Sequence, residues 1–324
     1  MMNFVKRLMR MREFMIFAVV ASMFVIMTFA SPHFLSERNL MAVMMALSLE
    51  AIVAVAMTNL MISGGFDMSV GSVAAFTGAA VARLMRLGVP VMLAVPLGLL
   101  IGACIGTLNG LIVAKIGINP FVTTLASLSL YRGLTMIITQ GRNISPLPAG
   151  FNAIGQSVIF GIQTPIWYAI IFVIIGDILL RKSRFFRKNY YIGGNEKAAR
   201  LSGIPVDRMK VFNYMFTGLF AAFAGIVMSA RLGSAAVTAA TGLELKVITA
   251  VIIGGASLAG GEGTVLGAFF GSLLMALIVN ALTLLGVDVY WQTFVIGATL
   301  LAAVLIDRLG KLRREKQFVK KEVL

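Results

Sequence analysis

The chain has 324 residues, of which 59% are hydrophobic and 13% charged, and its net charge is +15. A soluble protein of this size carries about a quarter charged residues, so the composition excludes an ordinary soluble domain. Uncharged runs such as 91–114 are long enough for helices that cross a bilayer, which need about 20 apolar residues. They are too evenly apolar for the alternating strands of a barrel. We therefore predict an all-α polytopic membrane protein.

The apolar pattern predicts about ten transmembrane helices. In chain order they fall near 14–31, 40–62, 68–85, 90–114, 121–139, 163–180, 211–230, 244–259, 264–285 and 290–307. We expect a single transmembrane domain over 1–324. It would comprise a head at 1–13, spans 1–6 within 14–180, a loop at 181–210, spans 7–10 within 211–307 and a tail at 308–324.

The basic residues indicate the orientation. Four of them precede the first apolar run, as in a secretion signal, but no small-residue cleavage site follows at 31–34, so we predict a retained first span. With the N-terminus inside, 21 of the 28 lysines and arginines fall in cytoplasmic segments. This split favours cytoplasmic N- and C-termini, an even number of spans and an inner-membrane location. Eight or twelve spans would fit equally well.

Two glycine pairs interrupt apolar helices at related places. Ile62-Ser63-Gly64-Gly65 and Ile252-Ile253-Gly254-Gly255 lie 190 residues apart, and each is followed by a short polar stretch and a second span. Paired breaks of this kind are typical of transporters built from two related halves. The alternative is two chance breaks. The candidate residues of a translocation pathway are Asn59, Ser63, Gly64, Gly65, Asp67, Ser69, Glu244, Gly254, Gly255, Ser257 and Asn280.

Several of these residues also fit a structural role. Asp67 is typical of a helix cap, and Asn280 of a hydrogen bond between helices. Glu50 lies inside a predicted span, where an acid indicates function or a pairing near a helix end. Gly98, Gly102, Gly106 and Gly110 recur every four residues, which predicts close helix packing, and we expect the lone Cys104 to be a small buried residue.

The sequence contains no recognisable nucleotide-binding motif. It contains no G-x-x-x-x-G-K-[ST] loop, so ATP would have to be bound by another subunit. We expect no cofactor and no metal site, because the chain has one histidine and one cysteine. We also expect no nucleic-acid partner, since the basic residues flank spans, where they suit a lipid membrane.

The loop at 181–210 is suited to contact such a subunit. Asn195 can cap a short helix containing Ala198, Ala199 and Leu201, and Gly203 with Pro205 would end it. The alternative is an ordinary capped cytoplasmic loop.

Four motifs resemble the permeases of ribose-type (carbohydrate uptake) ABC importers. The first, at 63–72, is similar to the family's G-G-I-D-L-S-V-G-S, and the second, at 193–204, to its G-G-N-x-x-A-A-x-x-S-G-I. The third is Ile253-Gly254-Gly255-Ala256-Ser257-Leu258-Ala259-Gly260-Gly261-Glu262-Gly263. The fourth runs from Asn280 through Leu284-Leu285-Gly286-Val287 to Tyr290 and Gln292.

This resemblance implies a ten-span permease subunit of an importer for a monosaccharide. It implies as partners a second permease subunit, two cytoplasmic ATP-binding subunits and a periplasmic or lipoprotein solute-binding protein. It also implies a coupling helix seated on the ATPase, formed by Gly193, Gly194, Asn195, Ala198, Ala199, Ser202, Gly203 and Ile204. Phe66, Lys246 and Glu262 depart from the family pattern, so the resemblance does not extend to fine substrate specificity.

Three other functions remain open at this point. The same ABC fold could carry a nucleoside or another sugar-like solute. A gradient-driven carrier or channel would need no ATPase and would hold an ion site, for example around Glu50 or Asp67. A membrane-embedded enzyme would need converging catalytic groups, which one histidine and dispersed acids do not supply.

Overall fold

The computed structural model describes residues 12–322, with side chains placed over 13–309. The helices of the first half are α2 (Arg12–Ala30), α3 (Glu37–Ile62), α4 (Val70–Arg86), α5 (Val91–Leu111) with its π-helical end η1 (Ile112–Ile116), α6 (Pro120–Thr139) and α7 (Ala149–Gln156). A two-stranded antiparallel hairpin follows, formed by β1 (Val158–Ile159) and β2 (Ile162–Gln163). The second half comprises α8 (Thr164–Lys182), α9 (Arg184–Gly194), α10 (Glu196–Leu201), α11 (Val206–Leu232), α12 (Leu243–Ile253), α13 (Val265–Leu284) and α14 (Val289–Glu322).

The predicted all-α polytopic membrane fold is confirmed. Each of the ten predicted spans corresponds to a helix, and eight of these helices are long and apolar enough to cross a membrane within the described part of the chain. The other two are α4, with 17 residues, and α12, with 11. At 1.5 Å per residue α12 rises only about 17 Å, roughly half of the hydrocarbon core. The expected end of this span at 259 was wrong because Gly254 and Gly255 stop the helix at Ile253.

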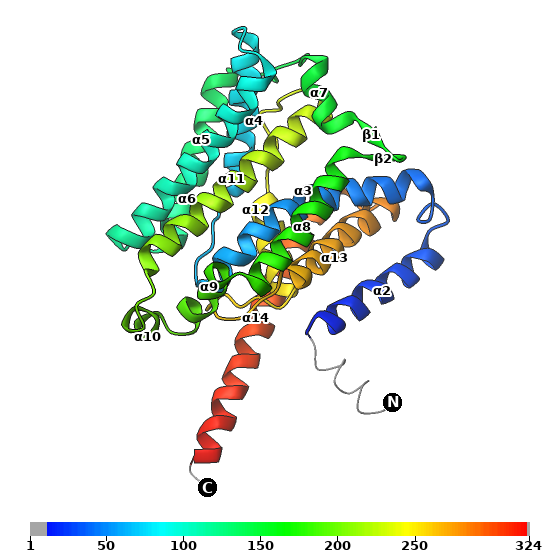
Figure 1. Cartoon of the computed structure of the whole chain (residues 1–324). Helices are drawn as coiled ribbons and strands as arrows, with labels where there is room; N and C mark the ends of the chain where they lie inside the picture. Colours follow the sequence, from blue (N-terminus) through cyan, green and yellow to red (C-terminus); the bar gives the residue numbers. More distant parts are fainter. Residues whose placement is uncertain (1–11, 323–324) are drawn as a thin grey trace.

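Helix α3 forms the centre of the molecule. Every residue from Ala51 to Ile62 is buried, and the helix packs against α8, α11, α12 and α13. Figure 1 shows α3 passing between α8 and α12, with α2 at the edge of the bundle. Because the second half of α3 is covered by protein on all sides, polar side chains there face other helices rather than lipid.

The glycine stripe of α5 packs against α11, as predicted. A Cβ atom at Gly102 would overlap Gly218, one at Gly106 would overlap the carbonyl group of Tyr214, and one at Gly110 would press on Val211. The two backbones therefore approach as closely as small residues permit. The expectation for Cys104 was wrong: its side chain is exposed, because it lies outside the packed face that the glycines share with Ile105 and Asn109.

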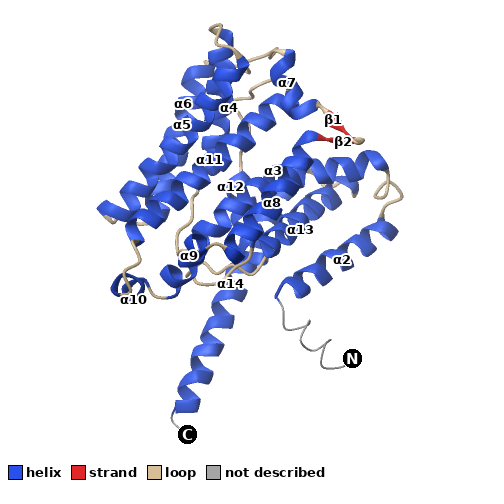
Figure 2. Ribbon diagram, viewed as in Figure 1, coloured by secondary structure: helices blue, strands red, loops and turns tan. Residues whose placement is uncertain are grey.

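The two ends of the bundle differ. One end carries α7 and the β-hairpin, and the other carries α9 and α10, with the start of α2 and the end of α14 on that same side (Figures 1 and 2). The 181–210 segment holds more helix than expected. Besides the predicted short helix it contains α9, and α11 already begins at Val206 instead of 211. The predicted tail is likewise part of α14, which runs unbroken to Glu322.

Candidate functional site

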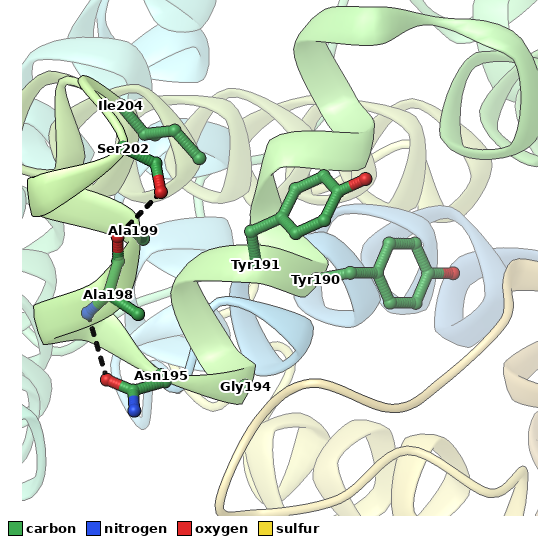
Figure 3. A pocket seen from close by; sticks show the side chains of 8 residues that line it. All are labelled: Tyr190, Tyr191, Gly194, Asn195, Ala198, Ala199, Ser202 and Ile204. Carbon is green, nitrogen blue, oxygen red and sulfur yellow. Dashed lines mark hydrogen bonds between the residues drawn. The ribbon is translucent and has the colours of Figure 1, made fainter.

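The short helix α10 begins as the sequence predicts. The side chain of Asn195 accepts a hydrogen bond of 3.0 Å from the backbone N–H of Ala198, and Ser202 donates 2.9 Å to the carbonyl of Ala198 (Figure 3). Gly203 adopts a φ of +78°, a left-handed conformation that ends the helix at low cost for glycine. A capped helix of six residues therefore lies at the end of the bundle, between α9 and α11.

A cavity of about 500 Å³ lies beside α10. Six of the eight residues predicted for coupling line it together with two tyrosines: Tyr190, Tyr191, Gly194, Asn195, Ala198, Ala199, Ser202 and Ile204. In Figure 3 the α9 tyrosines and the α10 residues form opposite sides of this hollow. Ala199 is only 4% exposed and packs with Ile192, Val206 and Met209, whereas Leu201 is 90% exposed. Helix α10 therefore has one face packed against the protein and one apolar residue exposed on the outside.

An ion-pair network fastens α10 to the start of α11. Glu196 bonds to Lys210 at 2.6 Å and to Arg200 at 2.9 Å, and Arg200 also bonds to Asp207. Partial burial acts to raise the pKa of Glu196, but the hydrogen bonds from Lys210 and Arg200 outweigh it, so this pKa is lowered. The network fixes α10 against the first turn of α11, a transmembrane helix.

Gly193, at the end of α9, contacts both helix breaks. A Cβ atom there would overlap the carbonyl oxygen of Ile62 and the amide nitrogen of Gly261. These two groups also bond to each other at 2.8 Å, so the first break and the second meet directly. The structure therefore brings the two glycine breaks together, against the helix that leads into α10.

Hydrogen bonds satisfy the backbone and side chains of the first break. Asp67 accepts from the N–H and hydroxyl of Ser69, and Asn109 donates 3.1 Å to that same hydroxyl. Ser63 accepts 3.1 Å from Asn213, which exchanges hydrogen bonds with Asn189 of α9. The N-cap residue of α4 is Ser69, so Asp67 bonds to the N-cap residue and does not itself cap the helix. Gly64, with a φ of +83°, and Gly65 carry the turn.

The second break is held just as closely. Gly254 crosses Gly267 with no room for a Cβ atom, and Gly255 has a φ of +97°. Ser257 lies within hydrogen-bond distance of Asp307 of α14 at 3.3 Å. Tyr190 of α9 donates 2.8 Å to the carbonyl of Gly263. Contacts with α9, α13 and α14 thus hold this irregular backbone in place.

Two predicted pathway residues, Asn280 and Glu244, lie away from the breaks, whereas Asn59 lies in the last turn of α3, where its carbonyl accepts the N–H of Ser63 at 3.3 Å. Asn280 exchanges hydrogen bonds of 2.6 and 3.2 Å with Asn39, which joins α13 to α3. Asn59 donates 3.1 Å to Val55 within α3. Glu244, in the first turn of α12, lies against Gly71 of α4, where a Cβ atom would overlap its carboxylate.

Sequence reasoning missed several residues of this site. Tyr190, Asn189 and Asn213 tie α9 to the breaks through hydrogen bonds that no local spacing encodes. The exposed Leu201 could have been predicted as a contact residue, because it is an apolar residue at the end of a short polar helix. Among the residues that the structure describes, no three His, Cys, Asp or Glu side chains are grouped to hold a metal ion.

Comparison with known proteins finds similarity to permeases of transport systems. Residues 39–304 match the family model described as branched-chain amino acid transport system / permease component. The chain is 42% identical to the ribose import permease protein RbsC of Escherichia coli K12 over 286 residues, 86% of this chain and 88% of the relative. It is 38% identical to the L-arabinose transport system permease protein AraH of the same strain over 290 residues, 90% and 88% of the two chains.

A third relative is the L-arabinose ABC transporter permease protein AraH of Azospirillum brasilense, 34% identical over 300 residues, 93% of this chain and 88% of the relative. No solved structure gives a significant match. The family match covers most of the chain, including both breaks and α9–α10. The chain therefore belongs to this family of transport permease components and is a multi-pass inner-membrane protein of the ribose-type ABC permeases.

Proposed function

We propose that this chain forms the transmembrane pathway for a monosaccharide and that separate ATPase subunits power it. Its similarity to ribose and L-arabinose permeases along about nine tenths of its length supports the solute class. In the assembly that we propose, two permease subunits pair with two cytoplasmic ATPases, and an external binding protein delivers the sugar.

The contact of Gly193 with both breaks carries this proposal. α10 is joined to α9 by the single residue Asn195, and α9 reaches Ile62 and Gly261 through Gly193. A push on α10 is thereby applied to α3 and to the loop that leads into α13, without passing through a flexible segment. Packed elements of this kind move as bodies because interiors resist deformation.

The proposed cycle follows from this connection. Sugar arrives with the binding protein at the end that carries α7 and the hairpin. ATP binding closes the partner subunits against α10, and α9 then displaces the two breaks together. The spans on either side of each break rock between outward and inward states, and the sugar leaves on the α10 side.

Leu201 provides a direct test. Its side chain is 90% exposed, so Leu201→Asp removes an apolar contact without changing the core. We expect the variant to insert normally but to lose co-purification with the ATPase and ATP-driven uptake of D-ribose or L-arabinose in proteoliposomes. Leu87→Asp is the matched control, because Leu87 is 68% exposed at the opposite end, after α4. Full uptake by Leu201→Asp would rule out α10 as the coupling surface.

A gradient-driven carrier is the competing function. It predicts uptake by the purified chain alone, whereas the proposal predicts none until the ATPase, ATP and binding protein are added. Uptake in vesicles that hold this chain only would contradict the proposal whatever the outcome for Leu201.

A further inference from the structure

A second cavity, of about 300 Å³, lies between α3, α4, α11 and the start of α12. It is open on one side, where Ala46, Thr238 and Thr241 are exposed, and it shares no lining residue with the hollow beside α10. Its lining consists of Ala46, Leu49, Glu50, Ala74, Ala224, Met228, Thr238, Ala240, Thr241, Leu243 and Lys246. Small and apolar side chains make up most of the wall, with one acid, one base and two hydroxyls among them.

The charged pair in this wall is loosely held. Lys246 Nζ lies 3.7 Å from Glu50 Oε1, which is an ion pair but too long for a direct hydrogen bond. The Glu50 side chain is 7% exposed, and its other oxygen, Oε2, has no hydrogen-bond partner among the described residues. A buried carboxylate oxygen without a partner costs free energy, so the pair is not arranged for stability alone.

The pair joins the middle of a long helix to the start of a short, interrupted one. Glu50 lies near the middle of α3, a helix of 26 residues, and Lys246 lies in the first half of the short helix α12. Solute sites in transporters are found near the bilayer midplane, beside interrupted helices. Arg132 of α6 braces the segment leading into α12 by donating 2.9 Å to the carbonyl of Ala239, which fixes one side of the cavity.

We propose that this cavity binds the monosaccharide during its passage, with Glu50 Oε2 accepting a hydrogen bond from one hydroxyl of the sugar and Lys246 donating to another. The inference rests on the proposed function. A neutral polyol both donates and accepts, so it suits an acid and a base that face the same space without satisfying each other. Ligand pockets begin at about 300 Å³, so the cavity admits one small solute at a time and excludes larger saccharides.

Weak binding suits a pathway, since a solute held tightly would not leave. A millimolar dissociation constant corresponds to only about 4 kcal/mol of binding free energy. Two hydrogen bonds to charged groups, offset by the loss of hydration, supply binding on this scale.

Protection of a cysteine in the cavity wall tests the proposal without any partner subunit. Met228 is half-buried and lines the cavity, so Met228→Cys in a Cys104→Ser background places a thiol there. The full chain in lipid nanodiscs is treated with a water-soluble maleimide, with and without D-ribose or L-arabinose. A ligand at about ten times its dissociation constant should slow the labelling about tenfold.

Variants of the pair identify the cause of any protection. We expect Glu50→Gln and Lys246→Met each to abolish it. Ser48→Ala is the matched control on α3, because the Ser48 hydroxyl bonds only to the carbonyl of Met45, at 2.8 Å, and is outside the cavity lining; it should leave protection intact. Leu87→Cys, far from the cavity, should be labelled equally with and without sugar, and sucrose at the same osmolarity should protect neither position.

The inference is overturned if Met228→Cys is not labelled at all, if sugar does not slow the labelling, or if protection survives in Glu50→Gln and Lys246→Met. Uptake by the complete transporter is measured in parallel. ATP-driven uptake without protection would contradict sugar binding in this cavity but leave the proposed function in place. Protection without ATP-driven uptake would support sugar binding in the cavity but contradict the proposed function.

Discussion

Gly193 is the residue where the smallest change should have the largest effect. A methyl group there would meet the backbone of Ile62 and Gly261, which has no side chain to rotate away. Overpacking of this kind costs about 1–3 kcal/mol and shifts neighbouring backbone. We expect Gly193→Ala to reduce uptake strongly while the protein still inserts.

Gly194 is the matched control, because nothing lies within 4 Å of a Cβ atom built there. Gly194→Ala should transport normally when both variants are compared in the reconstituted system at equal protein levels. Equal losses in the two variants would show that flexibility of α9, and not its contact with the breaks, is what matters.

Single residues were predictable where their role is local. The cap formed by Asn195 and the turn at Gly64 follow from short-range preferences and were found in place. For Asn280 a hydrogen bond between helices was one of two predicted roles, but its partner Asn39 lies 241 residues away and could not be named from the sequence. Lys246 could be read as a departure from a motif but not as the neighbour of Glu50, because only the packing of α3 on α12 brings them together.

At the scale of the element, α10 depends on its cap because six residues are too few to form a stable helix alone. Replacing an Asn cap by Ala costs about 1 kcal/mol. We expect Asn195→Ala to increase amide hydrogen exchange over 196–201, with little change in the transmembrane helices. Lys197→Ala, on the exposed side of α10, is the control and should leave exchange unchanged.

The ion-pair network should make α10 sensitive to acid. The pKa of Glu196 is lowered in the folded state, so its contribution is complete above the unfolded value near 4. It is lost as the pH falls through the lower folded value. We expect pepsin to cut at the exposed Leu201 faster, relative to a standard peptide, as the pH falls from about 5 to about 3.

The double variant Glu196→Gln, Asp207→Asn removes both carboxylates of the network. It should be cut quickly already at the upper end of this range and show no further change with pH. Acid sensitivity that persists in the double variant would assign the effect to other carboxylates.

Elements were predicted best where hydrophobicity alone defines them. Each of the ten predicted spans corresponds to a helix, although only eight of these helices are long and apolar enough to cross a membrane in the described part of the chain. Helix α9 was missed, because its aromatic residues Phe185, Phe186, Tyr190 and Tyr191 are interspersed with basic ones in a pattern typical of a loop flank. The short length of α12 depends on Gly254, which crosses Gly267 of α13. A contact between helices therefore fixed a boundary that local hydropathy placed six residues later.

For the molecule as a whole, the close approach of α5 and α11 should determine whether the bundle assembles. A methyl group at Gly106 would overlap the Tyr214 carbonyl and the Met215 backbone. We expect Gly106→Ala to lower the thermal midpoint of the detergent-solubilised protein, since such overpacking costs about 1–3 kcal/mol. Gly133→Ala in α6 meets nothing within 4 Å and should leave the midpoint unchanged or raise it.

The unbroken length of α14 has a consequence for assembly. Its 34 residues rise about 51 Å, whereas the hydrocarbon core takes up about 30 Å. Roughly the last dozen residues of α14 therefore extend beyond the hydrocarbon core, on the same side of the protein as α10 (Figure 1). A subunit that docks on α10 would lie beside this extension of α14, which restricts the directions from which it can approach.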